Sequence, residues 1–154
     1  MADINEVCDY IIMRLNEAGE SPSILKLQKL LYYSQSWNLA INKKRLFEGM
    51  FQAWVHGPVN RAVYDRFIDD KSMYSSVSQT DAAYGFNNLA EQDKSHINNV
   101  LEVYAPYSGN QLEELTHQEE PWQEARKGYK PSERCEVLIS EQLMQEYYSA
   151  RLDS

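Results

Sequence analysis

Cysteine is scarce in this chain of 154 residues, which contains only Cys8 and Cys135. Two cysteines without a CxxC pair exclude a disulfide framework. Long apolar runs are also missing, since no stretch approaches the roughly 18 apolar residues that a membrane-spanning helix needs. The first residues show no basic and apolar leader, so we expect a reduced protein of the cytoplasm that has no membrane partner.

Basic residues are in deficit, with 15 Lys and Arg against 23 Asp and Glu, for a formal net charge of −8. This balance argues against broad nucleic-acid binding, which needs a basic surface. The deficit is concentrated in residues 91–154, whose 6 basic and 13 acidic side chains give a net charge of −7. This acidic half is either a surface for a basic partner or a solvated face that keeps the protein soluble.

Signatures of catalysis and of metal binding are missing as well. The chain has no GxGxxG, GxxxxGK[ST], GxSxG or HExxH motif. His56, His96 and His117 are scattered, and with two cysteines they do not have the spacing of a zinc site. We therefore predict no catalytic residue, no metal and no cofactor, and we expect His96 to be exposed on a helix.

Apolar periodicity predicts that most of the chain is helical. Residues 4–15 place apolar side chains on one stripe of a helix that Asp3 caps and Gly19 ends. A second helix is predicted from Ser21-Pro22 to residues 40–42, and its apolar side chains cover several faces, which indicates a central position. Further helices are predicted over residues 91–104, from Ser108, from Pro121 to Gly128 and after Ser140.

Two short segments predict a minimal sheet. Phe51–Val55 alternates in polarity and is expected to pair with residues 136–139. Gly57-Pro58 ends the first strand, and Pro58 fits the first position of a third helix. Residues 69–88 are predicted to form a long surface loop. The expected fold is mainly α with a small β part: a compact bundle of six to seven helices with a two- or three-stranded sheet, forming one domain over residues 1–154.

Aromatic residues are plentiful, with 11 Tyr and 3 Trp. Trp54 and Trp122 adjoin apolar segments, so each is either a core anchor or an interface hot spot. Tyr74, Tyr84 and Tyr129 are expected to be exposed.

Three motifs carry the clearest functional signal. They are Leu25-Lys26-Leu27-Gln28-Lys29-Leu30-Leu31-Tyr32-Tyr33, then Phe51-Gln52-Ala53-Trp54-Val55-His56-Gly57-Pro58-Val59 followed by Tyr64, and Leu115-Thr116-His117-Gln118-Glu119-Glu120-Pro121-Trp122 continuing to Ala125-Arg126. In order and spacing they resemble the Panacea domain, also described as the SocA-like antitoxin domain, which is common in bacterial and prophage genomes. The resemblance extends over nearly the whole chain.

This resemblance implies a role in a toxin–antitoxin system. The implied partner is a cognate toxin encoded by an adjacent gene and neutralised by direct protein–protein binding. Alternatively, the SocA type is similar to a proteolytic adaptor, which would deliver the toxin to a cytoplasmic ATP-dependent protease. We predict neither the identity of the toxin nor the oligomeric state.

The motifs supply the candidate site residues, which we expect to converge near the corner where the first strand gives way to the third helix. In that position they either form a hydrogen-bonded network that fixes the fold or form a patch that engages toxins. In particular, Gln28 is expected to reach a backbone group beside the sheet. The candidates are Lys26, Gln28, Lys29, Tyr33, Trp54, His56, Gly57, Pro58, Tyr64, His117, Pro121 and Trp122.

Two other classes of function stay open. An uncharacterised enzyme would bring His56 and His117 together with Glu119 or Glu120 in one cleft. A phage protein that blocks a host factor would instead use the acidic C-terminal half, and its binding would weaken strongly with salt.

Overall fold

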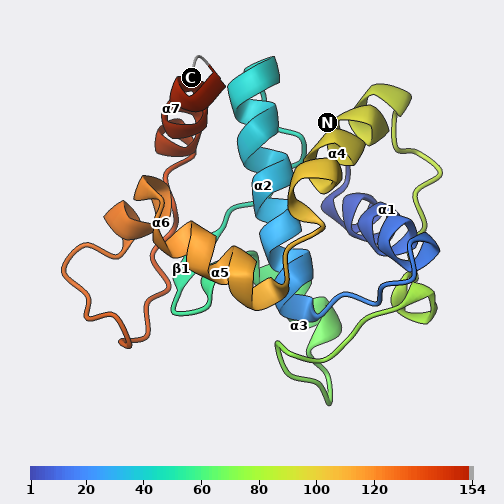
Figure 1. Ribbon diagram of the computed structural model, residues 1–154, viewed down its shortest axis with the longest axis horizontal. Helices are drawn as coiled ribbons and strands as arrows, with labels where there is room; N and C mark the ends of the chain where they lie inside the picture. The colour runs from blue at the N-terminus through green and yellow to red at the C-terminus, as the bar shows by residue number, and fades with distance from the viewer. Residues whose placement is uncertain (153–154) are drawn as a thin grey trace.

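The computed structural model describes residues 1–152, which form seven α-helices and a two-stranded sheet. Helix α2 lies in the middle, with α1 and α4 on one side and α6 and α7 on the other (Figure 1). The elements, in chain order, are α1 (Ile4–Glu17), α2 (Ile24–Asn42), β1 (Gln52–Trp54), β2 (Gly57–Val59), α3 (Arg61–Phe67), the 3₁₀ turn η1 (Gln79–Asp81), α4 (Glu91–Tyr104), α5 (Gly109–His117), α6 (Glu120–Ala125) and α7 (Glu141–Leu152). The predicted mainly α fold with a minimal sheet is confirmed.

The central position predicted for the second helix is also confirmed. Nearly every side chain of α2 is buried, because α1, α4, α5, α7 and β2 all pack against it. Its first turn is capped by the Ser23 hydroxyl, which accepts a hydrogen bond from the Lys26 amide at 3.0 Å. Apolar side chains on several faces of a helix indicate burial on several sides, and α2 has this pattern together with buried polar side chains such as Gln28 and Lys29.

Several predicted helix ends are confirmed by their caps. Asp3 accepts a hydrogen bond from the amide of Asn5 at the start of α1, and Ser108 forms a capping box with Gln111 at the start of α5. The Ser140 hydroxyl accepts a hydrogen bond from the amide of Leu143 in the first turn of α7.

The predicted pairing of the first strand is wrong in its main partner. β1 pairs with β2 in an antiparallel hairpin, with Ala53 opposite Pro58. Residues 135–139 form no strand, and the expected pairing is present as an isolated antiparallel bridge between Gln52 and Leu138. In this bridge the Ala53 amide donates to the Val137 carbonyl at 2.9 Å and the Ile139 amide donates to the Phe51 carbonyl at 2.8 Å. The reason is the burial pattern, since Cys135 and Ile139 are buried and the three residues between them are exposed, whereas a strand would alternate.

Pro58 does not begin the third helix as predicted. Gly57 has a φ of +94°, which turns the chain back at once, so that Pro58 becomes part of β2. Helix α3 starts three residues later, where the side chain of Asn60 accepts a hydrogen bond from the Val63 amide. Asn60 is a favoured N-cap residue, and it fixes the start of the helix better than the proline does.

His96 is buried, and its predicted exposure is wrong. Its Nε2–H donates to the backbone carbonyl of Ser34 at 2.9 Å, so the ring bridges α4 and α2. Burial lowers the pKa of this imidazole.

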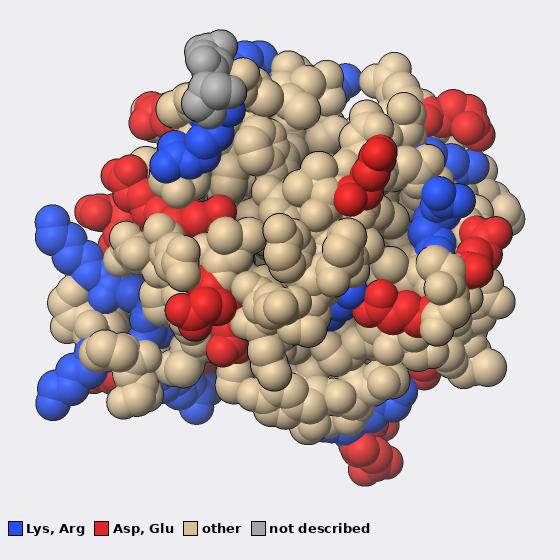
Figure 2. Space-filling model, viewed as in Figure 1, with Lys and Arg blue, Asp and Glu red and all other residues tan. Residues whose placement is uncertain are grey.

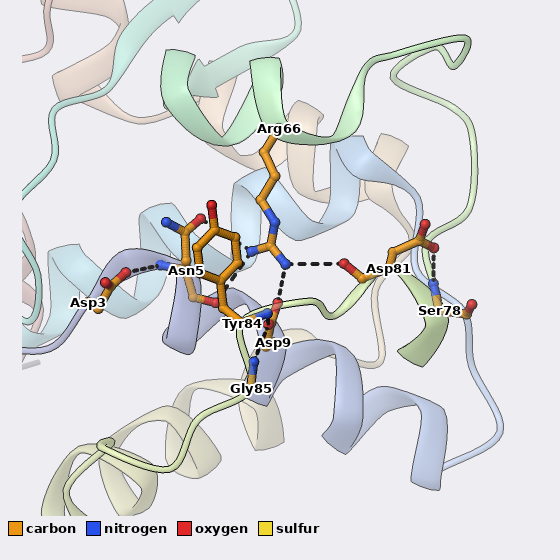
Figure 3. Close-up of polar contacts among 8 residues, drawn as sticks. All are labelled: Asp3, Asn5, Asp9, Arg66, Ser78, Asp81, Tyr84 and Gly85. Atoms are coloured by element: carbon orange, nitrogen blue, oxygen red, sulfur yellow. Dashed lines mark hydrogen bonds and ion pairs between the residues drawn. The ribbon is translucent and has the colours of Figure 1, made fainter.

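The long connection between α3 and α4 contains only η1 as a regular element, and its backbone is bonded to both members of a buried ion pair that joins α1 to α3 (Figure 3). Asp9 on α1 is fully buried, and its Oδ1 lies 2.6 Å from Nη2 of Arg66 on α3. Its Oδ2 accepts hydrogen bonds from the amides of Tyr84 and Gly85, both at 2.8 Å. One carboxylate thus fixes two distant segments, and both of its oxygens are satisfied.

Helix α7 covers the remaining side of α2 through an aromatic cluster. The hydroxyls of Tyr33 and Tyr148 both donate to Oε1 of Glu119, at 2.8 and 2.7 Å. Tyr33 also stacks on Tyr104 with ring centroids 4.0 Å apart. Burial raises the pKa of Glu119, although the two phenol hydrogen bonds oppose that shift.

None of the helices in residues 1–152 combines the length and the apolar character that crossing a bilayer requires.

Candidate functional site

The hairpin formed by β1 and β2 is the point on which most of the motif residues converge. At its turn, Gly57 packs so closely that a Cβ atom added there would lie 2.6 Å from Cε of Lys29 and 2.8 Å from Oγ1 of Thr116. Together with the positive φ, this contact requires glycine at position 57.

Helix α2 holds the outer edge of β2 with two side chains. Gln28 accepts a hydrogen bond from the Asn60 amide at 2.8 Å and donates to the Asn60 carbonyl at 3.0 Å, as a neighbouring strand would do. The ammonium group of Lys29 donates to the carbonyl of Pro58 at 3.0 Å. The prediction that Gln28 reaches the backbone beside the sheet is confirmed.

The third motif holds β1 and the turn from the other side. Three consecutive backbone carbonyls, those of Ala53, Trp54 and Val55, accept hydrogen bonds from Arg126, Trp122 and His117, each at 2.8 Å. The donors also stack on one another, since the rings of His117 and Trp122 lie 4.1 Å apart at 19°.

These hydrogen bonds come from elements far apart in the sequence. The first and third motifs therefore act as a clamp on the second, and we call the set Gln28, Lys29, His117, Trp122 and Arg126 the hairpin clamp.

Buried charge accompanies the clamp. Lys29 is fully buried, and burial lowers the pKa of its ammonium group to about 7. The negative charge of Glu113 acts in the opposite direction and raises the pKa of Lys29. Oε1 of Glu113 is itself buried without a hydrogen bond and lies 3.4 Å from Nδ1 of His56 at the surface. Burial also lowers the pKa of His117.

Three of the candidate residues lie away from the hairpin. Lys26 is buried, and its ammonium group is 2.7 Å both from Glu20 and from the carbonyl of Ala105, so it ties α2 to the end of α4. Tyr33 belongs to the aromatic cluster under α7. Pro121 lies in the first turn of α6, as the sequence predicts.

The outer face of the hairpin carries the motif side chains that reach the surface. Trp54 and Tyr64 are half-buried, and their rings meet edge to face at 4.9 Å. Together with His56 they line a cleft of about 390 Å³, to which Arg61 and Arg134 also contribute. The guanidinium of Arg61 lies 5.7 Å from the Trp54 ring, within the range of a cation–π interaction.

His117 and Glu119, which the enzyme alternative would bring into one cleft with His56, have separate partners in the structure. His117 uses Nε2 on a backbone carbonyl, and Glu119 is bonded to two tyrosines in a different part of the protein. Among residues 1–152, no group of three or more His, Cys, Asp or Glu side chains is placed to hold a metal ion.

Some residues of the site did not stand out in the sequence. Arg126 was visible only as the end of a motif. In the structure it is buried and donates hydrogen bonds to the carbonyl of Ala53 in β1 and to the carbonyl of Lys130 in the loop after α6. Its spacing of four residues from Trp122 is the signal that was available, and in the structure the guanidinium of Arg126, the C-cap residue of α6, lies 5.2 Å from the centroid of the Trp122 ring. Glu113 gave no signal of its role, and neither did the contact of Asn60 with Gln28, since these partners are distant in sequence.

The comparisons with known proteins agree with this geometry. The family model described as "Antitoxin SocA-like, Panacea domain" matches residues 27–123, which include the hairpin and all of the clamp except Arg126. Comparisons with curated proteins and with solved structures give no match. Since the family model covers more than half of the chain, the protein belongs to the SocA-like Panacea antitoxin domain family.

Proposed function

We propose that this protein is an antitoxin that acts in the cytoplasm, as one domain over residues 1–154, and neutralises a cognate toxin by direct binding. The toxin is encoded by an adjacent gene, and the contact surface is the cleft on the outer face of the hairpin. The observation that carries the proposal is that the family motifs build a clamped hairpin and leave Trp54, His56 and Tyr64 at the surface.

The physical argument rests on preorganisation. A two-stranded hairpin alone is marginally stable in water. Here the clamp ties the backbone of β1, the turn and β2 to three helices, so little conformational entropy is lost when a partner binds. Aromatic side chains with one polar atom are the residues that dominate interface energetics, and Trp54 and Tyr64 have this character.

A growth assay tests the proposal. The adjacent gene is expressed with and without this protein, and we expect growth arrest by the neighbour alone and recovery on co-expression. A neighbour that does not arrest growth, or an arrest that this protein does not relieve, would refute the antitoxin function.

Surface variants then test the cleft. Tyr64→Ala and His56→Ala should weaken rescue, whereas Tyr107→Ala should not, because Tyr107 is an exposed tyrosine away from the cleft. Copurification of a stable complex supports occlusion by binding. Rescue without a complex, accompanied by rapid loss of the toxin, would indicate delivery to a protease instead.

A further inference from the structure

A short basic loop interrupts the acidic half of the protein. Residues 91–154 contain only six Lys and Arg, and four of these lie within residues 126–134. Figure 2 shows basic side chains gathered at the left edge, where the connection from α6 to α7 runs in Figure 1. The side chains of Lys127, Lys130 and Arg134 are exposed, and Tyr129 between them is 41% exposed.

The loop has a fixed shape, set by its fourth cation. Arg126 is buried, and its Nη2 donates to the backbone carbonyls of Lys130 and Glu133 while its Nη1 donates to Ala53 of β1. The amide of Lys130 also donates to the Glu133 carboxylate at 3.0 Å. The exposed cations therefore lie on a loop whose backbone is already held by hydrogen bonds, so that little further ordering is needed when a partner binds.

The loop is continuous with the cleft of the hairpin. Ser132, Arg134 and Cys135 line the cleft opposite Trp54 and Tyr64. Arg61 adds a further cation at this rim, although it and Arg134 both approach Glu136, at 3.7 and 2.7 Å. Lys127 and Lys130 have no ion-pair partner among the described residues.

From this charge pattern we propose that the basic loop of residues 126–134 and the adjoining cleft bind an acidic segment of the toxin. The segment's carboxylates pair with Lys127, Lys130 and Arg134, and an apolar or aromatic side chain enters the cleft against Trp54 and Tyr64. The inference rests on the proposed antitoxin function and adds the chemistry of the partner. It differs from the alternative in which the acidic residues 91–154 form a surface for a basic partner.

A nucleic acid fits the surface less well. Phosphate-backbone binding uses an extended set of Lys and Arg contacts. This loop offers three exposed cations with Glu133 and Glu136 among them, on a protein of net charge −8. An acidic peptide segment needs fewer cations and gains from the apolar wall of the cleft.

The experiment combines charge reversal with rescue. Lys127→Glu/Lys130→Glu is compared with Arg14→Glu/Lys44→Glu, which changes the net charge equally at exposed positions outside the cleft. Circular dichroism confirms that both variants fold. With purified toxin, we expect the loop variant to lose at least about tenfold in association rate at low salt, while the control stays within about twofold of the wild type. Wild-type binding should weaken as salt is added.

The outcomes are distinguishable. Failure of the wild-type protein to rescue growth refutes the proposed function, and this inference with it. Rescue by the wild type and equally by the folded loop variant refutes only the inference. Loss of rescue that is restored by Glu→Lys or Asp→Lys changes in the toxin supports a direct contact. Binding of duplex DNA or RNA that competes with the toxin would overturn the choice of an acidic protein segment.

Discussion

Lys29 should make the stability of this protein rise with pH above neutrality. Burial lowers the pKa of its ammonium group from an ordinary value of 10.5 to about 7. Between these two values the unfolded chain holds a proton on Lys29 that the folded protein has lost. The free energy of unfolding therefore increases with pH in this window, with a slope of at most about 1.4 kcal/mol per pH unit for one group.

The magnitude follows from the same shift. Each pH unit of lowered pKa corresponds to about 1.4 kcal/mol, so burying the charged form of Lys29 costs up to about 5 kcal/mol below pH 7. Lys29→Met keeps an unbranched side chain and removes the charge, and it leaves the buried Pro58 carbonyl without its hydrogen-bond donor, which costs about 1–3 kcal/mol. We expect the variant to be more stable than the wild type below pH 7 and to show a flat profile above it.

Urea unfolding followed by circular dichroism measures both effects. The useful window runs from about pH 7 to about pH 8.5, because burial raises the pKa of Cys8 far above its ordinary value and the unfolded thiol begins to ionise at higher pH. Lys26→Met is the matched control, since the Lys26 ammonium is paired with Glu20. An equal rise in stability with pH in the wild type and in Lys29→Met would refute the assignment to Lys29.

Three further predictions concern other contacts. Gly57→Ala should lower the free energy of unfolding by more than about 1 kcal/mol, and by more than Gly85→Ala does. Both glycines have a positive φ, but only Gly57 has neighbouring atoms where the added Cβ would lie. Thermal melting compares the two variants, and equal losses of stability would contradict the steric argument. Asp9→Asn should lower the free energy of unfolding in urea by about 3–5 kcal/mol, since Arg66 is left without its buried partner. Hydrogen exchange at the amides of Tyr84 and Gly85 should accelerate in this variant, and unchanged exchange would show that Asp9 does not hold this connection. Stability should fall as the pH drops below about 6.5, because burial lowers the pKa of His117 and the unfolded chain therefore binds a proton on this histidine at a higher pH than the folded protein does. His117→Gln should reduce this loss when unfolding is measured at decreasing pH. An unaltered pH dependence would exclude His117 as a cause.

The sequence predicted the elements whose signals are local. The start of α5 was visible because Ser108 and Gln111 satisfy each other within one turn. The central position of α2 was visible because its apolar side chains cover several faces. By contrast, Pro58 fits the start of a helix as well as it fits a turn, and only the tertiary contact of Gly57 with Lys29 decides between them.

The sequence predicted which residues belong to the site, but it did not predict how they are arranged. The motifs contained all five residues of the clamp, but their side chains bond to backbone carbonyls, which the amino-acid sequence does not distinguish from one another. The buried position of Lys29 was also hidden, since a lysine on a helix is normally solvated.

The position of α7 has a consequence for the synthesis of the protein on the ribosome. Chains emerge with the N-terminus first, so α2 leaves the ribosome long before residues 141–152 exist. Until then Tyr32, Tyr33 and Trp37 lack their final cover, because Tyr148 of α7 packs against all three. A chain that lacks α7 therefore leaves these three side chains less covered than in the complete fold, and we expect it to be cleaved by proteases more readily. The aromatic cluster around α2 is complete only after α7 has been synthesised.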